Sequence, residues 1–269
     1  MRISFLGTGT SHGVPVVACS CPVCRSADPR DRRFRSSVVI EAAPGGAGAG
    51  ADGGGPAAVL VDAGPEFRLQ ALRAGIHRLD ALLLTHAHAD HLHGLDDVRP
   101  LSREAPLRVY GDRAALAETR ERFSYAFREG QKGGGKPRLE LLEAPAAGFG
   151  IKGLRILPVP LLHGALPVLG WRFGAFAYLT DCSAIPESSL PLLEGVEVAA
   201  LDGLRYRPHP THFSVDKAIA AARRLGLRET WLTHLTHDAS HAELEAYCAA
   251  RGADVGARPA WDGLVLDLP

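Results

Sequence analysis

The chain has 269 residues and no net charge when His is neutral, because 30 Lys and Arg residues balance 30 Asp and Glu residues. Its length fits one large α/β domain or two small ones, and its 46% hydrophobic and 22% charged residues are typical of a globular protein. The balanced charge argues against a general nucleic-acid-binding surface, although a local basic patch is compatible with it. No apolar run is long enough to cross a bilayer, and the N-terminus is too poor in apolar residues for a signal peptide. We therefore expect a cytoplasmic protein with no membrane partner.

The five cysteines indicate a metal site more than disulfide bonds. Three of them, Cys19, Cys21 and Cys24, lie within six residues, and an odd number without an export signal is not a disulfide pattern. Three thiols at this spacing can bind a tetrahedral zinc if a fourth ligand comes from elsewhere, whereas free thiols packed so densely would be prone to oxidation. We predict a structural zinc-binding loop at about residues 16–30, and packed free thiols at Cys182 and Cys248.

The N-terminal half reads as strands separated by loops and short helices. We predict helices at residues 65–75 and 113–123, where Pro65 and Asp112 favour the helix starts. Strands are predicted from residue 2 into a Gly/Thr turn and at 36–41, 57–62, 79–84 and 107–111. The Gly-rich stretch 44–56 is typical of a linker. We interpret the basic Gly-rich loop 130–137 as a solvated tip, and prefer this to a substrate lid.

The most informative stretch follows the apolar strand at 79–84. In Thr85-His86-Ala87-His88-Ala89-Asp90-His91, three imidazoles and one carboxylate fall within six positions. His86 and His88 point the same way in an extended backbone and can hold one cation. Asp90 and His91 come where the chain bends and can hold another. Imidazole and carboxylate together suit zinc, manganese or iron, so we favour a metal site over a solvated loop that happens to contain histidines.

The C-terminal half continues with further strands and helices. Helices are predicted at 186–193, 215–225 and 241–251, and strands at 139–142, 154–161, 170–173, 175–182, 196–202, 229–233 and 264–266. His163, Asp181 and His234 each follow an apolar strand, so we expect them to meet the 86–91 motif at one rim. Two strand-rich halves, each followed by helices, predict an α/β fold with two sheets packed face to face and helices outside.

The motif T-H-x-H-x-D-H, followed by a lone His, an Asp and a further His, resembles the metallo-β-lactamase superfamily. The resemblance covers nearly the whole chain. It implies a single hydrolase domain over residues 1–269, an αββα sandwich of two mixed β-sheets flanked by helices. By position it also implies two divalent metals, one held by His86, His88 and His163, the other by Asp90, His91 and His234, with Asp181 bridging them.

Leu6-Gly7-Thr8-Gly9-Thr10, Gly13-Val14-Pro15 and C-x-C-x-x-C are similar to the phosphoribosyl cyclic phosphodiesterase family of the carbon–phosphorus lyase pathway. This resemblance implies that His237 completes a structural Zn²⁺ site with Cys19, Cys21 and Cys24. It implies that His212 and Asp90 act in catalysis, with two Zn²⁺ or Mn²⁺ ions in the active site. The substrate would be a small phosphodiester such as a ribose cyclic phosphate or a related nucleotide. Two metals about 3.5–4 Å apart can lower the pKa of a shared water and clamp phosphoryl oxygens, while His212 could protonate the leaving oxygen.

Three other functions stay open. Ribonuclease Z shares the motif, although the zero net charge and C-x-C-x-x-C argue against RNA processing. The chain also resembles the pyrroloquinoline-quinone biosynthesis protein B at its cysteine cluster. The third option is a binding protein that is stabilised by zinc and catalyses no reaction. We interpret His209 as a surface residue, and His93 and His241 as surface or outer hydrogen-bonding groups. The sequence leaves open the role of His12 and the oligomeric state, with a homodimer as one option.

Overall fold

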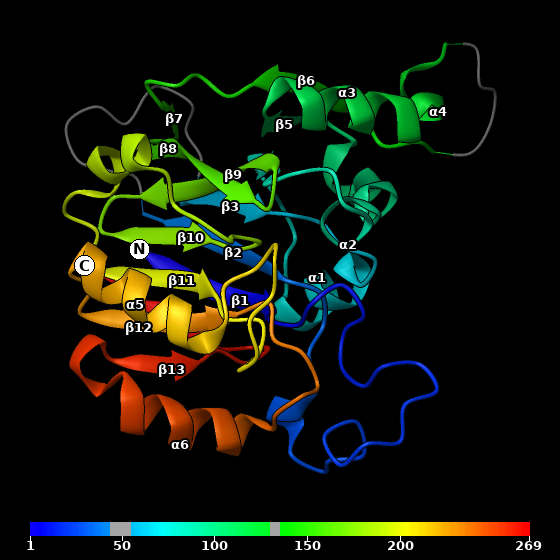
Figure 1. The fold of residues 1–269 in the computed structure, drawn as a ribbon. Coiled ribbons are helices and arrows are strands. Elements are labelled where there is room, and N and C mark those ends of the chain that lie inside the picture. The colour runs from blue at the N-terminus through cyan, green and yellow to red at the C-terminus, as the bar shows by residue number, and fades with distance from the viewer. Residues whose placement is uncertain (44–54, 130–134) are drawn as a thin grey trace.

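Two seven-stranded mixed sheets lie face to face at the centre of the computed structural model, which describes residues 1–43, 55–129 and 135–269 (Figure 1). The predicted linker at 44–54 and the loop tip at 130–134 lie outside the described residues. In spatial order the first sheet consists of β14 (Val265–Asp267), β1 (Arg2–Gly7), β2 (Ser37–Ala42), β3 (Ala57–Val61), β4 (Ala81–Leu83), β5 (Leu107–Gly111) and β6 (Leu139–Glu143). The second consists of β13 (Ala257–Pro259), β12 (Glu229–Thr233), β11 (Val198–Asp202), β10 (Phe176–Leu179), β9 (Leu166–Phe173), β8 (Leu154–His163) and β7 (Phe149–Ile151).

Helices cover the outer faces of both sheets. The α-helices are α1 (Phe67–Ala74), α2 (Ala89–Leu92), α3 (Arg113–Arg122), α4 (Ser124–Phe127), α5 (Val215–Leu225) and α6 (His241–Arg251). Four 3₁₀ helices add η1 (Pro29–Asp31), η2 (Leu95–Ser102), η3 (Glu187–Leu193) and η4 (Ala253–Val255). In the view of Figure 1, both chain ends lie on the left, and α1 and α2 lie on the right. None of the helices in the described ranges combines the length and hydropathy that crossing a membrane requires.

Three apolar clusters hold these layers together. Side chains such as Phe5 and Ile40 from the first sheet and Trp171 and Tyr178 from the second form the cluster between the sheets. A second cluster joins the second sheet to α5 and α6, and a third joins the first sheet to α1, α3 and η2. Strands β10 and β11 are buried along their whole length because they are covered on both faces. The αββα arrangement expected from the sequence is confirmed.

Most predicted elements are present, with differences where the local sequence is ambiguous. Helices α5 and α6 have the predicted bounds, since Ser214 and Ser240 accept the capping hydrogen bonds at their starts. The helix expected at 186–193 is the 3₁₀ helix η3, which contains Pro191 and so lacks one donor for an α-helical ladder. Strand β9 starts at Leu166, four residues before the prediction, and pairs with β8 in a hairpin the sequence did not reveal. The three-residue strands β7 and β13 were not predicted, because they are too short to show a period.

A buried carboxylate ties the end of the chain to its beginning. The Oδ1 of Asp262 accepts a hydrogen bond from Thr8 Oγ1 at 2.8 Å, and its Oδ2 accepts one from the Phe34 amide at 2.7 Å. Burial raises the pKa of Asp262 to about 7, because it disfavours the charged form more than these two donors favour it. The group is therefore protonated in the folded chain at pH values at which the unfolded chain is already ionised.

We expect this carboxyl group to make folding stability depend on pH between about 4 and 7. Its folded pKa lies above its unfolded value, so its contribution is greatest at acidic pH and falls as the pH rises to about 7. The fall is at most about 4 kcal/mol if about 3 pKa units separate the two states. Asp262→Asn should flatten this part of the curve of unfolding free energy against pH. Asp267→Asn, at an exposed carboxylate of the same segment, is the control and should leave the curve between pH 4 and 7 unchanged; an equal slope in wild type and Asp262→Asn would contradict the assignment.

Candidate metal centre

Four side chains from both sheets form a first cluster of possible ligands. His86 and His88 follow β4, His163 is the last residue of β8, and Asp181 follows β10. One ligand atom of each lies within 4.8 Å of the others. His86 Nε2 is 3.9 Å from Asp181 Oδ2. His88 is the exposed member of the cluster, so the group opens to solvent on its side.

A second cluster consists of Asp90, His91, Asp181 and His234, and all four are buried. His91 Nε2 lies 3.2 Å from an oxygen of Asp90 and 3.2 Å from Asp181 Oδ1. His234 Nε2 lies 3.3 Å from Asp181 Oδ2 and 3.6 Å from Asp90 Oδ2. Asp181 belongs to both clusters, which is the position that a bridging carboxylate requires. The structure thus brings together all seven residues that the sequence pattern grouped at one rim.

The donor atoms of these clusters fit divalent cations. Among the described residues, His86 Nε2, His91 Nε2 and both ring nitrogens of His234 are buried without a hydrogen-bond partner. A buried polar atom left without a partner costs free energy, so such atoms are rare in folded proteins. Here the three Nε2 atoms face oxygens of Asp181 across gaps of 3.2–3.9 Å. A mixed set of imidazole nitrogens and carboxylate oxygens suits zinc, manganese or iron.

Hydrogen bonds behind the clusters orient the rings. His91 Nδ1 donates to Asp62 Oδ2 at 2.7 Å, and Asp62 is itself held by the amide and hydroxyl of Thr85, both at 2.8 Å. His163 Nδ1 donates to the carbonyl of Thr211 at 2.7 Å. Each of these bonds fixes one ring nitrogen as a donor, which leaves Nε2 as the atom available to a metal. Asp62 was missed by the sequence analysis, although it is the last residue of the strand predicted at 57–62.

The backbone is strained where the clusters are attached. Asp62, Asp181 and His234 have φ values of 59°, 51° and 58°, in the left-handed region that residues other than glycine rarely adopt. Such a conformation costs about 1–3 kcal/mol per residue and persists where surrounding structure imposes it, often at functional sites. Asp62 and His234 directly follow the last residues of β3 and β12, and Asp181 lies two residues after the end of β10. The turns place Asp62 beside His91, and Asp181 beside His91 and His234.

The carboxylates and imidazoles of these clusters shift one another's pKa values. Burial lowers the pKa of His91, but the carboxylates of Asp181, Asp90 and Asp62 outweigh burial and hold this pKa well above its usual value. Burial raises the pKa of Asp181, but His234 and His91 outweigh it and hold that pKa well below its usual value. Burial, followed by the nearby charge of His91, holds the pKa of His86 well below its usual value. Protons on imidazole thus balance the carboxylates, and a cation would take over this role and release protons.

His212 lies against these clusters, as the sequence resemblance implied. Its Nδ1 donates to Asp202 Oδ2 at 2.5 Å, and its ring stacks on His234 with a centroid distance of 4.7 Å and an angle of 15°. Asp202 also accepts hydrogen bonds from the amides of Cys182 and Leu204, at 2.9 and 3.2 Å, so its position is fixed. Asp202 is the second residue that the sequence analysis missed. Its place at the end of β11, ten residues before His212, is the feature that could have revealed it.

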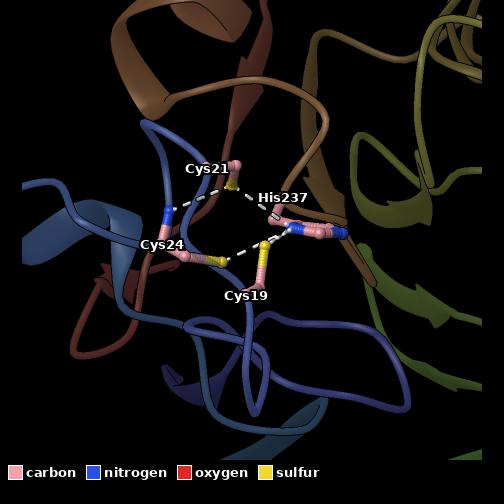
Figure 2. A group of neighbouring side chains, drawn as sticks. All are labelled: Cys19, Cys21, Cys24 and His237. Atoms are coloured by element: carbon pink, nitrogen blue, oxygen red, sulfur yellow. Dashed lines mark hydrogen bonds between the residues drawn. The ribbon is translucent and has the colours of Figure 1, made fainter.

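The three clustered cysteines converge on the predicted fourth partner (Figure 2). The Sγ atoms of Cys19, Cys21 and Cys24 each lie 3.4 Å from His237 Nδ1. A Cys₃His donor set of this kind is typical of structural zinc. The amides of Val16 and Cys24 donate to Cys24 Sγ and Cys21 Sγ, at 3.3 and 3.4 Å. The donation from Cys24 is the main cause that lowers the pKa of Cys21 to about 6, which favours the thiolate that binds metal.

The cysteine loop is joined to the loop that carries His234. His237 follows His234 by three residues in the segment between β12 and α6. Arg33 is 1% exposed and donates to the carbonyls of Thr236 and Ala239 in that segment. It also pairs with the buried carboxylate of Asp31 at 3.3 Å. The two candidate metal sites therefore share one short connection.

The other histidines and cysteines divide into confirmed and corrected interpretations. His12 and His93 are exposed. His241 is only 1% exposed and packs edge-on to Trp261, so it is not a surface residue. It is the first residue of α6, and the backbone amide of His241 donates to the buried carboxylate of Asp31. His209 was expected at the surface, but it is half-buried with its ring 5.2 Å from that of His212. Cys182 and Cys248 are buried free thiols, as predicted.

The chain is similar in sequence and in structure to several known proteins. Residues 57–235 match the family model described as a beta-lactamase superfamily domain. A solved structure of a new diphosphatase from the PhnP family is 38% identical, with a TM-score of 0.85 and coverage of 100% of this chain and 98% of that one. Octanoyltransferase of Porphyromonas gingivalis is 41% identical over 241 residues, 89% of this chain. Coenzyme PQQ synthesis protein B of Rhodopseudomonas palustris is 31% identical over 129 residues, 44% of this chain. The matches span only 46% and 37% of the lengths of these last two proteins.

We predict about three divalent metals per chain, two in the His/Asp clusters and one in the Cys₃His site. Cys21→Ser should lose one of the three and lower the unfolding temperature, because the loop at 16–30 has few apolar contacts of its own. Elemental analysis of purified protein, with thermal unfolding beside it, measures both effects. Ser20→Ala, in the same loop and exposed, is the matched control and should keep all three metals. An unchanged metal content in Cys21→Ser would contradict the zinc assignment.

Proposed function

Because this chain belongs to the PhnP family of the β-lactamase superfamily, we propose that it is a metal-dependent phosphodiesterase acting on small substrates. The chain is a hydrolase of the metallo-β-lactamase fold. The finer proposal is that it hydrolyses small phosphodiesters, including cyclic ones such as ribose cyclic phosphates, or the related diphosphate bonds of nucleotides. The observation that carries it is the pair of donor clusters that share Asp181 and lie against His212.

The donor atoms assign a role to each candidate ligand. One metal would be held by His86, His88 and His163, and the other by Asp90, His91 and His234, with Asp181 shared between them. When bound, two such metals lower the pKa of water and polarise a phosphoryl oxygen. Two divalent cations carry four positive charges, of which Asp90 and Asp181 neutralise two. The site would therefore keep a net positive charge and attract a phosphate group.

His212 supplies the acid that hydrolysis of a phosphoester requires. Asp202 holds Nδ1 as a donor, so Nε2 is the ring nitrogen left to carry or release a proton. The stacking of the ring on His234 keeps it beside the proposed metal ligands. In this position His212 would protonate the leaving oxygen or stabilise the charge that develops on the phosphoryl group. The same arrangement serves a phosphodiester and a diphosphate, since both release an oxygen from phosphorus. The similarity to a PhnP-family diphosphatase supports testing both.

Acyl transfer is a second candidate because of the similarity to octanoyltransferase. That name belongs to a protein of which the match spans 46%, so it can describe the remainder of that protein. Cys182, next to Asp181, is fully buried, and burial and then Asp202 raise its pKa well above the usual value. A thiol in this state is a poor nucleophile. The chemistry of the site therefore favours attack on phosphorus over a covalent acyl intermediate.

We expect Asp181→Ala to lose at least about 100-fold in kcat/KM, because one carboxylate serves both donor clusters. The substrates are bis-p-nitrophenyl phosphate, 2′,3′-cyclic AMP and ADP, with p-nitrophenyl octanoate for the acyl alternative and a precursor tRNA for the ribonuclease Z alternative. Metal content is measured on the same samples. Full activity in Asp181→Ala would exclude the proposed mechanism, and turnover of the octanoate ester or the tRNA alone would replace the proposed substrate class.

Asp202→Asn tests the positioning of His212. We expect kcat to fall about 10–100-fold with a shifted pH–rate profile, because the amide no longer stabilises the charged imidazole. Metal content should stay at the wild-type value, which separates this effect from loss of a ligand. His209→Ala, in the same loop, is the matched control and should stay within about threefold of wild type. Equal pH–rate profiles for wild type and Asp202→Asn would show that Asp202 does not act through His212.

A further inference from the structure

A cavity of about 700 Å³ lies on the outer side of the first sheet, away from the candidate metal ligands. Its walls come from α1, η2 and the segment at 135–138, and none of its lining residues is a candidate ligand or His212. This volume lies within the range of about 300–1,000 Å³ that is usual for small-molecule sites. The proposed phosphodiesterase activity makes no use of it.

The cavity lining is strongly cationic. Arg68, Arg103 and Arg138 line it, and among the described residues none of the three has a carboxylate oxygen within 4.0 Å. The Arg138 guanidinium donates instead to the carbonyls of Arg103 and Glu104, at 2.9 and 3.5 Å. Asp97 is the one acidic side chain in the described part of the lining. Uncompensated guanidinium groups of this kind are the usual partners of phosphate and carboxylate.

Part of the remaining wall is aliphatic. Leu72 of α1 is 67% exposed, and it lines the cavity together with Ile76 and Leu101. The ring of Phe67 is 1% exposed and offers no free face, so the exposed ring of the described lining is the imidazole of His77. Covering Leu72 would remove apolar surface from water and stabilise a complex. Leu72, Ile76 and Leu101 therefore offer an aliphatic surface on which an alkyl chain can pack.

We propose that this cavity binds an organic phosphate with a single aliphatic chain, whose phosphate pairs with the cavity arginines and whose chain packs on Leu72, Ile76 and Leu101. Both features of the cavity are needed for binding. The arginines bind the phosphate, and Leu72, Ile76 and Leu101 bind the aliphatic chain. The site is separate from the metal centre. If the cavity does not bind this ligand, the proposed hydrolase activity is unaffected. If the chain is not a phosphodiesterase, the proposed binding in the cavity is unaffected.

Titration calorimetry of the metal-loaded full chain with octyl phosphate tests this proposal, at concentrations at which the ligand is monomeric. Besides any phosphate bound at the proposed metal centre, which Asp181→Ala should weaken and Leu72→Ser should not, we expect one site per chain at the cavity, and the affinities below refer to that site. Inorganic phosphate and octan-1-ol, which each carry half of the ligand, should bind at least tenfold more weakly. Affinity should fall as salt is added, because the arginines are exposed. Equal affinity for octyl phosphate and inorganic phosphate would overturn the proposal, as would binding to phosphatidylglycerol vesicles without binding of the monomer.

Variants locate the binding in the cavity. Arg68→Glu with Arg103→Glu should weaken octyl phosphate at least tenfold, and Leu72→Ser should weaken it while leaving inorganic phosphate unchanged. Arg32→Glu makes the same charge change at an exposed arginine outside the cavity and should bind like wild type. All these variants should hydrolyse bis-p-nitrophenyl phosphate as wild type does. Wild-type affinity for octyl phosphate in both the double variant and Leu72→Ser would show that the ligand binds elsewhere, and would overturn the assignment. If the double variant does not fold, Leu72→Ser by itself tests the assignment.

Discussion

The carboxylate of Asp181 is the point on which the chemistry and the architecture of this rim both depend. It is 2% exposed and lies within 4 Å of ring nitrogens from His86, His91 and His234. The first two follow β4 of the first sheet, and His234 follows β12 of the second. A buried charge that loses its partners costs several kcal/mol. The rim is thus stable when cations or protons balance its carboxylates, and the strained backbone at Asp181 shows that the surrounding sheets impose this position.

The connection between β12 and α6 joins the two proposed metal sites. It carries His234 toward the rim and His237 toward the cysteine loop. Buried Arg33 donates to the carbonyl of Thr236, between these two histidines, and to that of Ala239, just after them. A metal at the Cys₃His site would fix one end of a short segment whose other end positions a proposed catalytic ligand. The two proposed metal sites are therefore connected through one short segment, although they share no proposed ligand.

The layered fold separates this rim from the cationic cavity outside the first sheet. The two are nevertheless built on neighbouring segments, since the His91 carbonyl accepts the amide of Ala63 and Phe67 of the cavity wall lies against Gly94. Close contact of this kind leaves no room for a side chain at Gly94, where an added Cβ would lie 2.1 Å from the Gly64 carbonyl. The turn after α2 thus supports the metal rim on one side and a wall of the cavity on the other.

Features whose residues are neighbours along the chain can be predicted without the fold. The 86–91 motif, the cysteine cluster, the strand-end positions of His163, Asp181 and His234, and the capped helices α5 and α6 follow from spacing and periodicity. The tertiary structure decided the partners of these groups: Asp62 for His91, Asp202 for His212 and Arg33 for the β12–α6 segment. An aspartate or a buried arginine carries no local mark of its partner, because that partner is supplied by a separate segment. For the same reason, only the folded chain could bring distant arginines and leucines around one cavity.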